Sequence, residues 1–189
     1  MVSMGAEVTL EVLQMSEKSE KLKIYTYPSS ILRQKARPVV DINGELKKLT
    51  DNMLYTMYSA PGIGLAANQV GSVDRVIVFD LKPDEKDIRK PCVLINPEIV
   101  EREGTTKSEE ACLSVIDYSA EVRRNAEILV RGVDINGNPL EIEADGLLAI
   151  CLQHEIDHLN GVLFIDRISS LKRAMYKKKL KKILASKER

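Results

Sequence analysis

The sequence is short of several residue types that particular protein classes require. It has no tryptophan, 4% aromatic residues, two histidines and three cysteines among 189 residues. An odd number of widely spaced cysteines does not form the framework of a disulfide-stabilised secreted domain, so we expect reduced thiols and a cytoplasmic protein. The longest apolar run, Leu147–Leu152, has six residues, whereas a membrane-spanning helix needs about 20.

The N-terminus lacks the features of a targeting peptide. Met1–Leu22 has no basic start and carries four glutamates: Glu7, Glu11, Glu17 and Glu20. Secretory signals begin with basic residues, and transit peptides are rich in arginine and poor in acidic residues. We therefore expect residues 1–22 to be a poorly ordered extension, with Met15 as an alternative start, before a single globular domain.

Charge is balanced overall but unevenly distributed. The chain has 28 basic and 28 acidic residues, and nine of the basic ones, against one glutamate, fall within residues 171–189. Apolar residues recur there at helical spacing: Tyr176, Leu180, Ile183 and Leu184. Residues 169–186 therefore predict a helix that either rests an apolar stripe on the body or presents its lysines to RNA phosphates.

Hydrophobic periodicity predicts an α+β domain. Pro28-Ser29-Ser30 followed by Ile31-Leu32 predicts a turn that opens a short helix. Asn43 is a candidate N-cap for a helix that ends before Pro61-Gly62. Asp145 is a candidate cap for a further helix that ends at Asn160-Gly161. Extended runs are expected at Arg75–Asp80, Val93–Ile95, Ile99–Arg102, Glu121–Val133, Leu140–Glu143 and Val162–Ile165. This order predicts mostly antiparallel strands around a central helix, with a C-terminal helix.

The segment His154-Glu155-Ile156-Asp157-His158 is the strongest functional signal. It contains both histidines of the chain, and residues four apart project from one helical face, so both imidazoles can bind one metal ion. Glu155 is the expected acid–base residue of a metal-dependent hydrolase, because glutamate reaches farther than aspartate towards a water on the metal. Asp157 is expected to orient a ligand or to lie on the helix surface.

The predicted helix supplies only two ligands, so a third must come from another segment. Cys151 shares the helical face, but it lies about 7.5 Å from the level of the metal along the helix axis. Its Cα–Cβ bond also points away from the ion, so we expect a core residue. Cys112, Cys92 or a distant carboxylate remains, and spacing does not distinguish them.

A glycine-rich segment imitates a dinucleotide-binding fingerprint. Gly62–Ala67 fits G-x-G-x-x-A, and Asp80 follows at the end of a predicted strand. That fingerprint requires a strand before its first glycine, whereas residues 46–57 predict a helix. The glycines are better explained by a close approach of the backbone to some other group.

Three motifs in this order resemble the peptide deformylase family over roughly residues 24–167. The segment GIGLAANQ, residues 62–69, matches GxGxAAxQ at every fixed position. EACLS, residues 110–114, matches EGCLS except at Ala111, and QHEIDH, residues 153–158, matches QHExDH. The resemblance implies a catalytic domain over residues 23–170, followed by a basic C-terminal helix over residues 171–189.

The resemblance implies removal of the formyl group from the N-formylmethionine of newly made proteins, with release of formate. It implies that Cys112 joins His154 and His158 as third metal ligand and that Glu155 is general base and acid. The implied oxyanion donors are Gln69 and the backbone N–H of Leu113, and the implied substrate-binding residues are Ile63, Gly64 and Leu113. Ligand type alone favours zinc, whereas the resemblance implies Fe2+ in the cell, with Zn2+, Ni2+ or Co2+ as replacements.

The chain departs from the family pattern beside the third ligand. Ala111 replaces a glycine, which strains the segment if that position needs a positive φ. Ile116 and Ser119 stand where the family commonly has proline and arginine. These differences concern the rim of the site and substrate preference rather than the metal.

Two alternatives remain open beside deformylation. One is a catalytically impaired homologue that binds metal or formylated peptides, and the other is a different HExxH peptidase. The expected partners are nascent formylated polypeptides and the ribosome, reached through the basic C-terminal helix. No membrane or DNA partner is expected.

Overall fold

The computed structural model describes residues 19–81 and 89–187, in which seven strands form two antiparallel sheets. The strands are β1 (Gly64–Ala66), β2 (Val76–Phe79), β3 (Cys92–Glu103), β4 (Thr106–Cys112), β5 (Val115–Arg124), β6 (Glu127–Val133) and β7 (Pro139–Ala144). The helices are η1 (Ser30–Arg33), α2 (Gly44–Ser59), η2 (Ala67–Val70), α3 (Gly146–Leu159), η3 (Phe164–Asp166) and α4 (Ser170–Lys187). The larger sheet has the order β1-β2-β3-β6-β7, and β4 pairs with β5 alone. The predicted α+β fold with antiparallel strands is confirmed.

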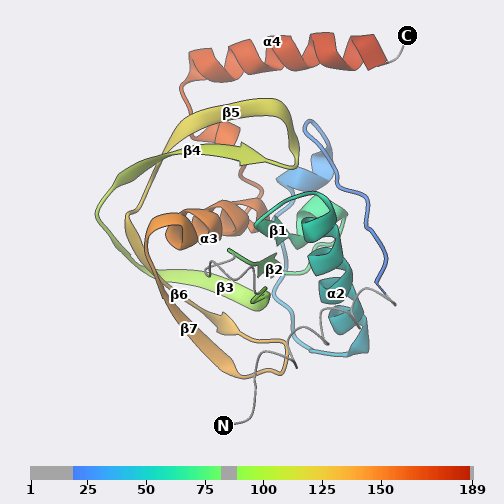
Figure 1. Cartoon of the computed structure of the whole chain (residues 1–189), viewed down its shortest axis with the longest axis vertical. Helices are drawn as coiled ribbons and strands as arrows, with labels where there is room; N and C mark the ends of the chain where they lie inside the picture. The colour runs from blue at the N-terminus through green and yellow to red at the C-terminus, as the bar shows by residue number, and fades with distance from the viewer. Residues whose placement is uncertain (1–18, 82–88, 188–189) are drawn as a thin grey trace.

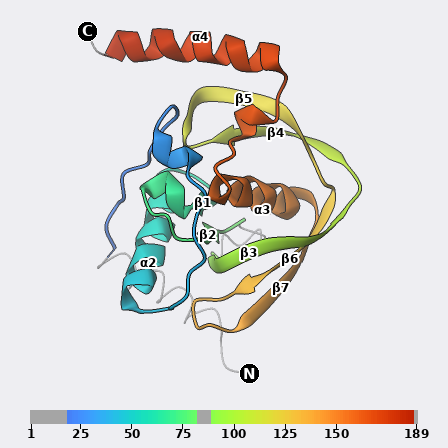
Figure 2. The ribbon, with the colours of Figure 1, turned by 180° about the vertical axis from the view of Figure 1, so that it is seen from behind.

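Helix α3 lies at the centre of the molecule (Figure 1). The β4–β5 hairpin lies on one side of it and strands β3, β6 and β7 on the other, as the view from behind also shows (Figure 2). Leu152 and Ile156 of α3 are buried in one apolar cluster with Leu94 and Val130 of the larger sheet. Because strands surround it, α3 buries residues around most of its circumference rather than along one stripe.

Both residues predicted to precede a helix, Asn43 and Asp145, occupy N-cap positions in the structure. The side-chain oxygen of Asn43 accepts hydrogen bonds from the backbone N–H groups of Glu45 and Leu46, at 3.0 and 3.1 Å, as an N-cap residue does. Asp145 also occupies the cap position of α3, but its side chain accepts no capping hydrogen bond. The extended conformation expected for residues 162–165 was wrong in part, because Phe164 begins the 3-10 helix η3.

Strand boundaries differ from the sequence pattern at irregular positions. The two short runs expected at residues 93–95 and 99–102 form one strand, β3, with register shifts between Ile95 and Glu98, where Pro97 lies, and between Ile99 and Glu101. A bulge accommodates proline, which cannot donate to a ladder. The single run expected at residues 121–133 is divided by Asn125 and Ala126 into β5 and β6, which belong to different sheets.

Strand β4 escaped prediction because its inward-facing residues are polar. Along Thr106–Cys112, the more buried positions alternate as in any strand. They are, however, occupied by Ser108, Glu110 and Cys112, so no hydrophobic period of two is present. The polar lining of this strand is what forms one wall of the site described below.

The described part of the N-terminal segment packs along α2 and then reaches two sequence motifs. The backbone N–H groups of Glu20 and Leu22 donate to side chains of α2, each at 2.8 Å. Tyr25 N–H donates to the carbonyl of Gln69, and Tyr27 N–H donates to the carbonyl of Ser114, both at 2.8 Å. Of the extension expected over residues 1–22, residues 1–18 lie outside the described part of the chain.

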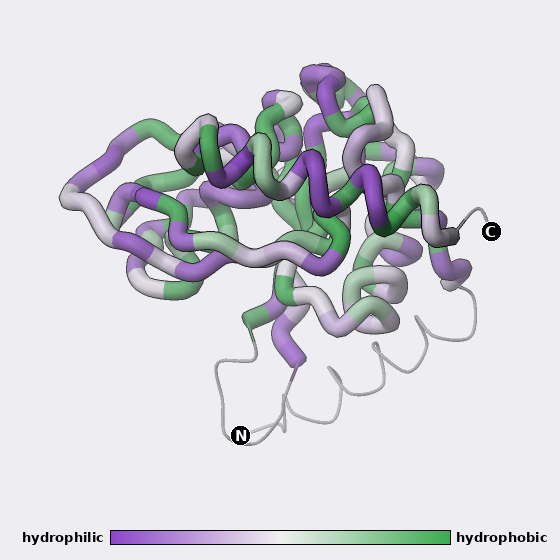
Figure 3. Tube along the Cα trace, turned by 90° about the horizontal axis from the view of Figure 1, so that it is seen from above, coloured by the Kyte–Doolittle hydropathy of each residue, from purple (hydrophilic) through white to green (hydrophobic). Residues whose placement is uncertain are grey.

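Helix α4 packs on the β4–β5 hairpin through one face. Tyr176 and Leu180 are buried in a cluster with residues of β5, and the Tyr176 ring lies 4.6 Å from that of Tyr118. Leu171 and Met175 are exposed. Figure 3 shows hydrophilic and hydrophobic residues alternating along this helix. The expected apolar stripe against the body is therefore confirmed, and the six lysines of α4 from Lys172 to Lys182 are exposed.

None of the described helices has the combination of length and hydropathy needed to cross a membrane.

Candidate functional site

One cysteine and two histidines from distant parts of the sequence meet at the centre of the molecule. His154 and His158 project from the same face of α3, and their Nε2 atoms are 3.3 Å apart. Cys112, at the end of β4, places its Sγ 3.1 Å from Nε2 of His158. Among the described residues, these three are the only group of His, Cys, Asp or Glu arranged to hold a metal ion.

The other two cysteines are not part of this group. Cys151 is buried, with its Sγ 3.8 Å from the carbonyl oxygen of Ile63, and the prediction that it belongs to the core is confirmed. Cys92 begins β3 and packs against the same apolar cluster. Burial raises the pKa of the Cys92 thiol to about 11, which disfavours the thiolate that binds metals. Of the three candidates that spacing left open for the third ligand, the structure brings Cys112 to the histidines.

The donor set fits a single divalent metal ion. Two imidazole nitrogens and a thiolate are the ligands of tetrahedral catalytic sites in which a fourth position is left for water. His154 Nδ1 contacts a carboxylate oxygen of Glu110 at 2.8 Å, so its Nε2 is free to face the metal position. Burial lowers the pKa of His158, which favours the neutral imidazole that a metal binds.

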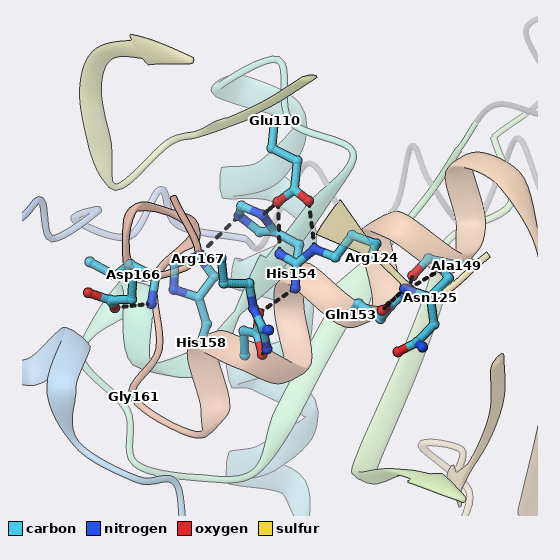
Figure 4. Close-up of polar contacts among 12 residues, drawn as sticks. Glu110, Arg124, Asn125, Ala149, Gln153, His154, His158, Gly161, Asp166 and Arg167 are labelled. Carbon is cyan, nitrogen blue, oxygen red and sulfur yellow. Dashed lines mark hydrogen bonds and ion pairs between the residues drawn. The ribbon is translucent and has the colours of Figure 1, made fainter. Parts of the chain in front are cut away.

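Glu110 belongs to a buried network of charged side chains behind the histidines (Figure 4). Its two carboxylate oxygens accept hydrogen bonds from Nε and Nη2 of Arg124, at 2.6 and 2.8 Å. The remaining Nη1 of Arg124 donates to Asp157, which also accepts two hydrogen bonds from Arg167. The network therefore runs from the exposed Arg167 through the buried Asp157, Arg124 and Glu110 to His154.

The electrostatics of this network hold Glu110 in its charged form. Burial alone would raise its pKa, but the hydrogen bonds from Arg124 and His154 lower it to about 2. A charged carboxylate at Nδ1 fixes the orientation of the His154 ring and increases the basicity of Nε2. Of the two positions expected for Asp157, the helix surface and the support of a ligand, the structure excludes the surface: Asp157 is buried and is linked to His154 through Arg124 and Glu110.

Glu155 follows His154 on α3 and lines the same pocket as Cys112 and His154. Its side chain is buried, and its Oε2 atom is buried without a hydrogen-bond partner among the described residues. Burial raises the pKa of Glu155 to about 7. A carboxylate that gains and loses a proton near neutral pH is suited to general base and acid catalysis.

Gln69 comes to the same place from the glycine-rich segment, where β1 leads into η2. Its Oε1 accepts a hydrogen bond from the backbone N–H of Ala66 at 2.8 Å, which fixes the amide group. Its Nε2 consequently faces the hairpin, 3.1 Å from the hydroxyl of Ser114 and 3.6 Å from Sγ of Cys112. Helix α2, not a strand, precedes these glycines, so the dinucleotide interpretation is excluded by the fold as well.

A cleft of about 340 Å³ gives access to the site. It is bounded by residues 61–64 and Gln69, by residues 108–113 of the hairpin, and by α3 from Leu147 to Glu155. The exposed side chain of Ile63 and the half-buried side chain of Leu113 both line this cleft. Every predicted site residue, from Ile63 and Gly64 to His158, lies in this cleft or at the metal position behind it.

Ala111 adopts an ordinary strand conformation. It is exposed, pairs with Ser119 of β5, and is not among the described residues with positive φ. Of the two outcomes considered for this departure, the strained one is therefore excluded, and the alanine only adds a methyl group at the edge of the cleft.

Glu110 and Arg124 are site residues that the sequence reasoning did not assign. In the sequence, Glu110 is recognisable only as the first residue of the second motif. The signal available was its position two residues before Cys112, which places both side chains on one face of a strand. Arg124 gave no such signal, because its contact with Glu110 depends on how the hairpin folds over α3.

Comparisons with known proteins agree on one family. The model of the polypeptide deformylase family matches residues 21–174. A peptide deformylase of Thermodesulfovibrio yellowstonii is 52% identical over 160 residues, which cover 85% of this chain and 96% of that protein. A peptide deformylase of Mesorhizobium japonicum is 54% identical over 161 residues, covering 85% of this chain and 91% of that protein.

Solved structures give the same result. A peptide deformylase from Legionella pneumophila superimposes with a TM-score of 0.83 at 44% identity, covering 90% of this chain and 99% of that one. A peptide deformylase from Synechococcus elongatus in complex with actinonin has a TM-score of 0.79, also at 44% identity, covering 84% and 86% of the two chains. With the family match spanning most of the sequence, the chain belongs to the peptide deformylase family.

Proposed function

We propose that this protein is an active, metal-dependent deformylase that removes the formyl group from N-formylmethionine at the start of newly made polypeptides. The observation that carries the proposal is the convergence of Cys112, His154 and His158 beside the buried carboxylate of Glu155, within one open cleft. We assign this chemistry to residues 23–170 and treat residues 171–189 as an appended basic helix.

In the proposed reaction, Cys112, His154 and His158 hold one divalent metal ion. When bound, such an ion supplies Lewis acidity, lowering the pKa of a water and polarising the formyl oxygen. Glu155 takes a proton from the attacking water and delivers it to the nitrogen of the leaving amine. Its raised pKa, about 7, allows both transfers near neutral pH.

The same cleft holds donors for the negative charge that develops on the formyl oxygen. We assign this role to Nε2 of Gln69, whose amide is fixed by Ala66, and to the backbone N–H of Leu113. Donors that are already oriented stabilise the transition state without further reorganisation. Gly64 is assigned to the substrate main chain, and Ile63 and Leu113 are assigned to the methionine side chain.

For the metal, we propose Fe2+ in the cell, with Zn2+, Ni2+ or Co2+ able to occupy the same ligands. A thiolate beside exposed iron is sensitive to oxygen, and Cys112 is only partly buried. We propose that the protein acts in the cytoplasm, where this thiol stays reduced and nascent chains are made.

The test is purification without oxygen, metal analysis, and an assay of formate release on the same sample. We expect about one divalent metal per chain and release of formate from formyl-Met-Ala-Ser, with no cleavage of the acetylated or unblocked peptide. Hydrolysis of an internal peptide bond without formate would identify a peptidase instead. A metal-loaded protein that binds the formylated peptide without turnover would identify an impaired homologue.

Gly64→Ala should strongly reduce turnover without removing the metal. A Cβ atom at this position would lie 2.6 Å from Oε1 of Glu155 and 2.9 Å from Sγ of Cys151, so the carboxylate must move. Misplacing a catalytic group by about 1 Å lowers the rate about 100-fold. Gly44→Ala is the matched control, because nothing lies within 4 Å of its added Cβ. Equal kcat in both variants would show that Glu155 tolerates displacement.

Ala111→Gly should change little. The position has no positive φ, so glycine relieves no strain, and an exposed substitution of this kind changes kcat/KM within about twofold. Steady-state kinetics with formylated peptides of different length would measure it. A large increase in kcat would instead mean that the alanine methyl obstructs the cleft.

We propose further that α4 contacts ribosomal RNA. Its lysines from Lys172 to Lys182 are exposed while Tyr176 and Leu180 anchor the helix to the body, so the charge can change without unpacking it. Neutralising four exposed lysines to glutamine, Lys177, Lys178, Lys181 and Lys182, should weaken co-sedimentation with ribosomes about tenfold at low salt and flatten its salt dependence. The control carries glutamine at four exposed lysines elsewhere, Lys21, Lys35, Lys47 and Lys48. If both variants co-sediment like the wild type, α4 is only a structural element.

A further inference from the structure

A second cavity, of about 460 Å³, lies on a different face of α3 from the cleft. The two share no lining residue: the cleft uses Cys151, His154 and Glu155, whereas the second cavity uses Gln153, Ile156, Asp157 and Asn160. Five arginines line it: Arg75, Arg102, Arg123, Arg124 and Arg167. We call it the arginine cavity. Glu98 and Asp157 are the acidic residues in its lining.

The arginines of this cavity differ in whether a carboxylate neutralises them. Arg124 and Arg167 share Asp157, and Arg124 also binds Glu110. Arg75, in contrast, donates to neutral acceptors, the carbonyl of Pro97 at 2.9 Å and the side-chain oxygen of Asn160 at 3.0 Å. It forms no salt bridge within the described part of the chain, although it is half-buried.

The remaining two arginines also lack an acidic partner. Arg102 and Arg123 are exposed at the rim, and neither forms a salt bridge to any residue that the structure describes. Three guanidinium groups around one cavity, one of them half-buried, therefore have no ion-pair partner among the described residues. Glu98, in the same lining, attracts Arg75 without forming a salt bridge to it. Burial lowers the pKa of Arg75, which reflects the cost of holding this cation away from water.

We propose that the arginine cavity binds a phosphoryl group. Guanidinium groups form paired hydrogen bonds with phosphate oxygens and retain their charge at all physiological pH values. A phosphate monoester carries close to two negative charges near neutral pH, which matches several unpaired arginines better than a single carboxylate does. The ligand chemistry is a phosphate oxyanion, supplied either by a small phosphate compound or by the phosphodiester backbone of RNA.

The arrangement of the walls suits such a ligand. Arg75 is held in place by Pro97 and Asn160, so little side-chain entropy is lost when it binds an anion. Arg102 approaches from β3, and Arg123 approaches from β5. The site thus combines one half-buried guanidinium group, held by hydrogen bonds, with two exposed guanidinium groups. It is independent of the proposed deformylase chemistry, because none of these three arginines lines the catalytic cleft.

The test titrates the metal-loaded, full-length protein with inorganic phosphate by isothermal calorimetry. It compares the wild type with the double variant Arg102→Gln/Arg123→Gln, which alters only exposed side chains. We expect saturable binding to one site, weakened at least about tenfold by the double variant. Arg131→Gln is the control, because that exposed arginine pairs with Glu141 on the larger sheet, outside the lining of the cavity. Thermal unfolding of each variant establishes that it is folded.

A second titration uses a six-nucleotide single-stranded RNA and distinguishes the sources of the phosphate. If the wild type binds inorganic phosphate and the double variant does not, a small phosphate compound is a sufficient ligand for the arginine cavity. If only RNA binding weakens, with the slope of log affinity against log salt reduced by about one, the ligand is a backbone phosphate. If neither ligand binds, or if the double variant binds both as well as Arg131→Gln does, the proposal is overturned.

Discussion

Glu155→Gln should lower kcat for deformylation by about 100-fold to 10,000-fold, the range that general acid–base catalysis contributes. The amide is nearly isosteric with the carboxylate but neither accepts the proton of the attacking water nor delivers one to the leaving amine. The measurement is formate release under saturating substrate, with KM determined for both proteins so that binding and catalysis are separated.

The variant should keep its metal and its stability. Glu155 is not one of the three residues that could hold the metal ion. The metal content should therefore stay at about one ion per chain. Because burial raises the pKa of Glu155, the folded state disfavours its charged form, and a neutral glutamine should not lower the free energy of unfolding at pH 8. Glu143→Gln on β7, away from the cleft, serves as control. Full activity of Glu155→Gln would exclude the proposed mechanism.

Arg124→Met should produce the largest loss of stability among single substitutions outside the ligands. The arginine side chain is 2% exposed and that of Glu110 is 3% exposed, so removing the cation leaves two carboxylates, Glu110 and Asp157, buried without it. Removing one partner of a buried ion pair lowers the free energy of unfolding by about 3–5 kcal/mol. Urea unfolding of the metal-free protein would measure the change. The metal is removed so that its binding energy does not mask the effect.

The matched control is Arg131→Met, which breaks an exposed ion pair with Glu141. Such pairs contribute little because solvent screens them, so the unfolding midpoint should hardly change. If both variants lost stability equally, the buried network would contribute no more than a surface pair. A stable Arg124→Met protein that fails to bind metal would instead assign the network to orienting His154 alone.

The pH dependence of stability supplies an independent check on the same network. The pKa of Glu110 is lowered from 4.5 to about 2 in the folded protein. A lowered pKa stabilises the folded state at pH values above the unfolded pKa, and this contribution disappears as the pH falls towards the folded pKa. The wild type should therefore lose this stabilisation between about pH 4.5 and 2, and Arg124→Met should show a smaller change in that interval.

The elements that sequence analysis predicted well are those whose signals are local. Asn43 caps α2 with its own side chain, and the histidines of α3 converge because both lie on one helix. The site residues that local signals could not assign depend on contacts between distant segments. Cys112 reaches His158 only because the β4–β5 hairpin folds over α3, so the residues alone left three candidates for the third ligand and the family resemblance made the choice.

The buried charges were missed for a related reason. Hydrophobic periodicity assumes that buried positions are apolar, whereas β4 directs Ser108 and Glu110 inward. A buried glutamate is tolerated there because Arg124 neutralises it. The partner is supplied by a different strand, and its sequence position carries no mark of that role.

The hydrogen bonds of Tyr25 and Tyr27 have a consequence for how this protein is made. These residues leave the ribosome before the segments that bind them, since Gln69 and Ser114 are synthesised later. Glu20, Leu22 and Tyr25 can form their hydrogen bonds once Gln69 has emerged, whereas the bond of Tyr27 waits for the hairpin. The segment with Tyr25 and Tyr27 can therefore connect the first and second motifs only after the second motif, which contains Ser114, has been translated. We expect limited proteolysis of stalled nascent chains to cleave near Tyr27 in chains from which Ser114 has not yet emerged, and much less in longer ones.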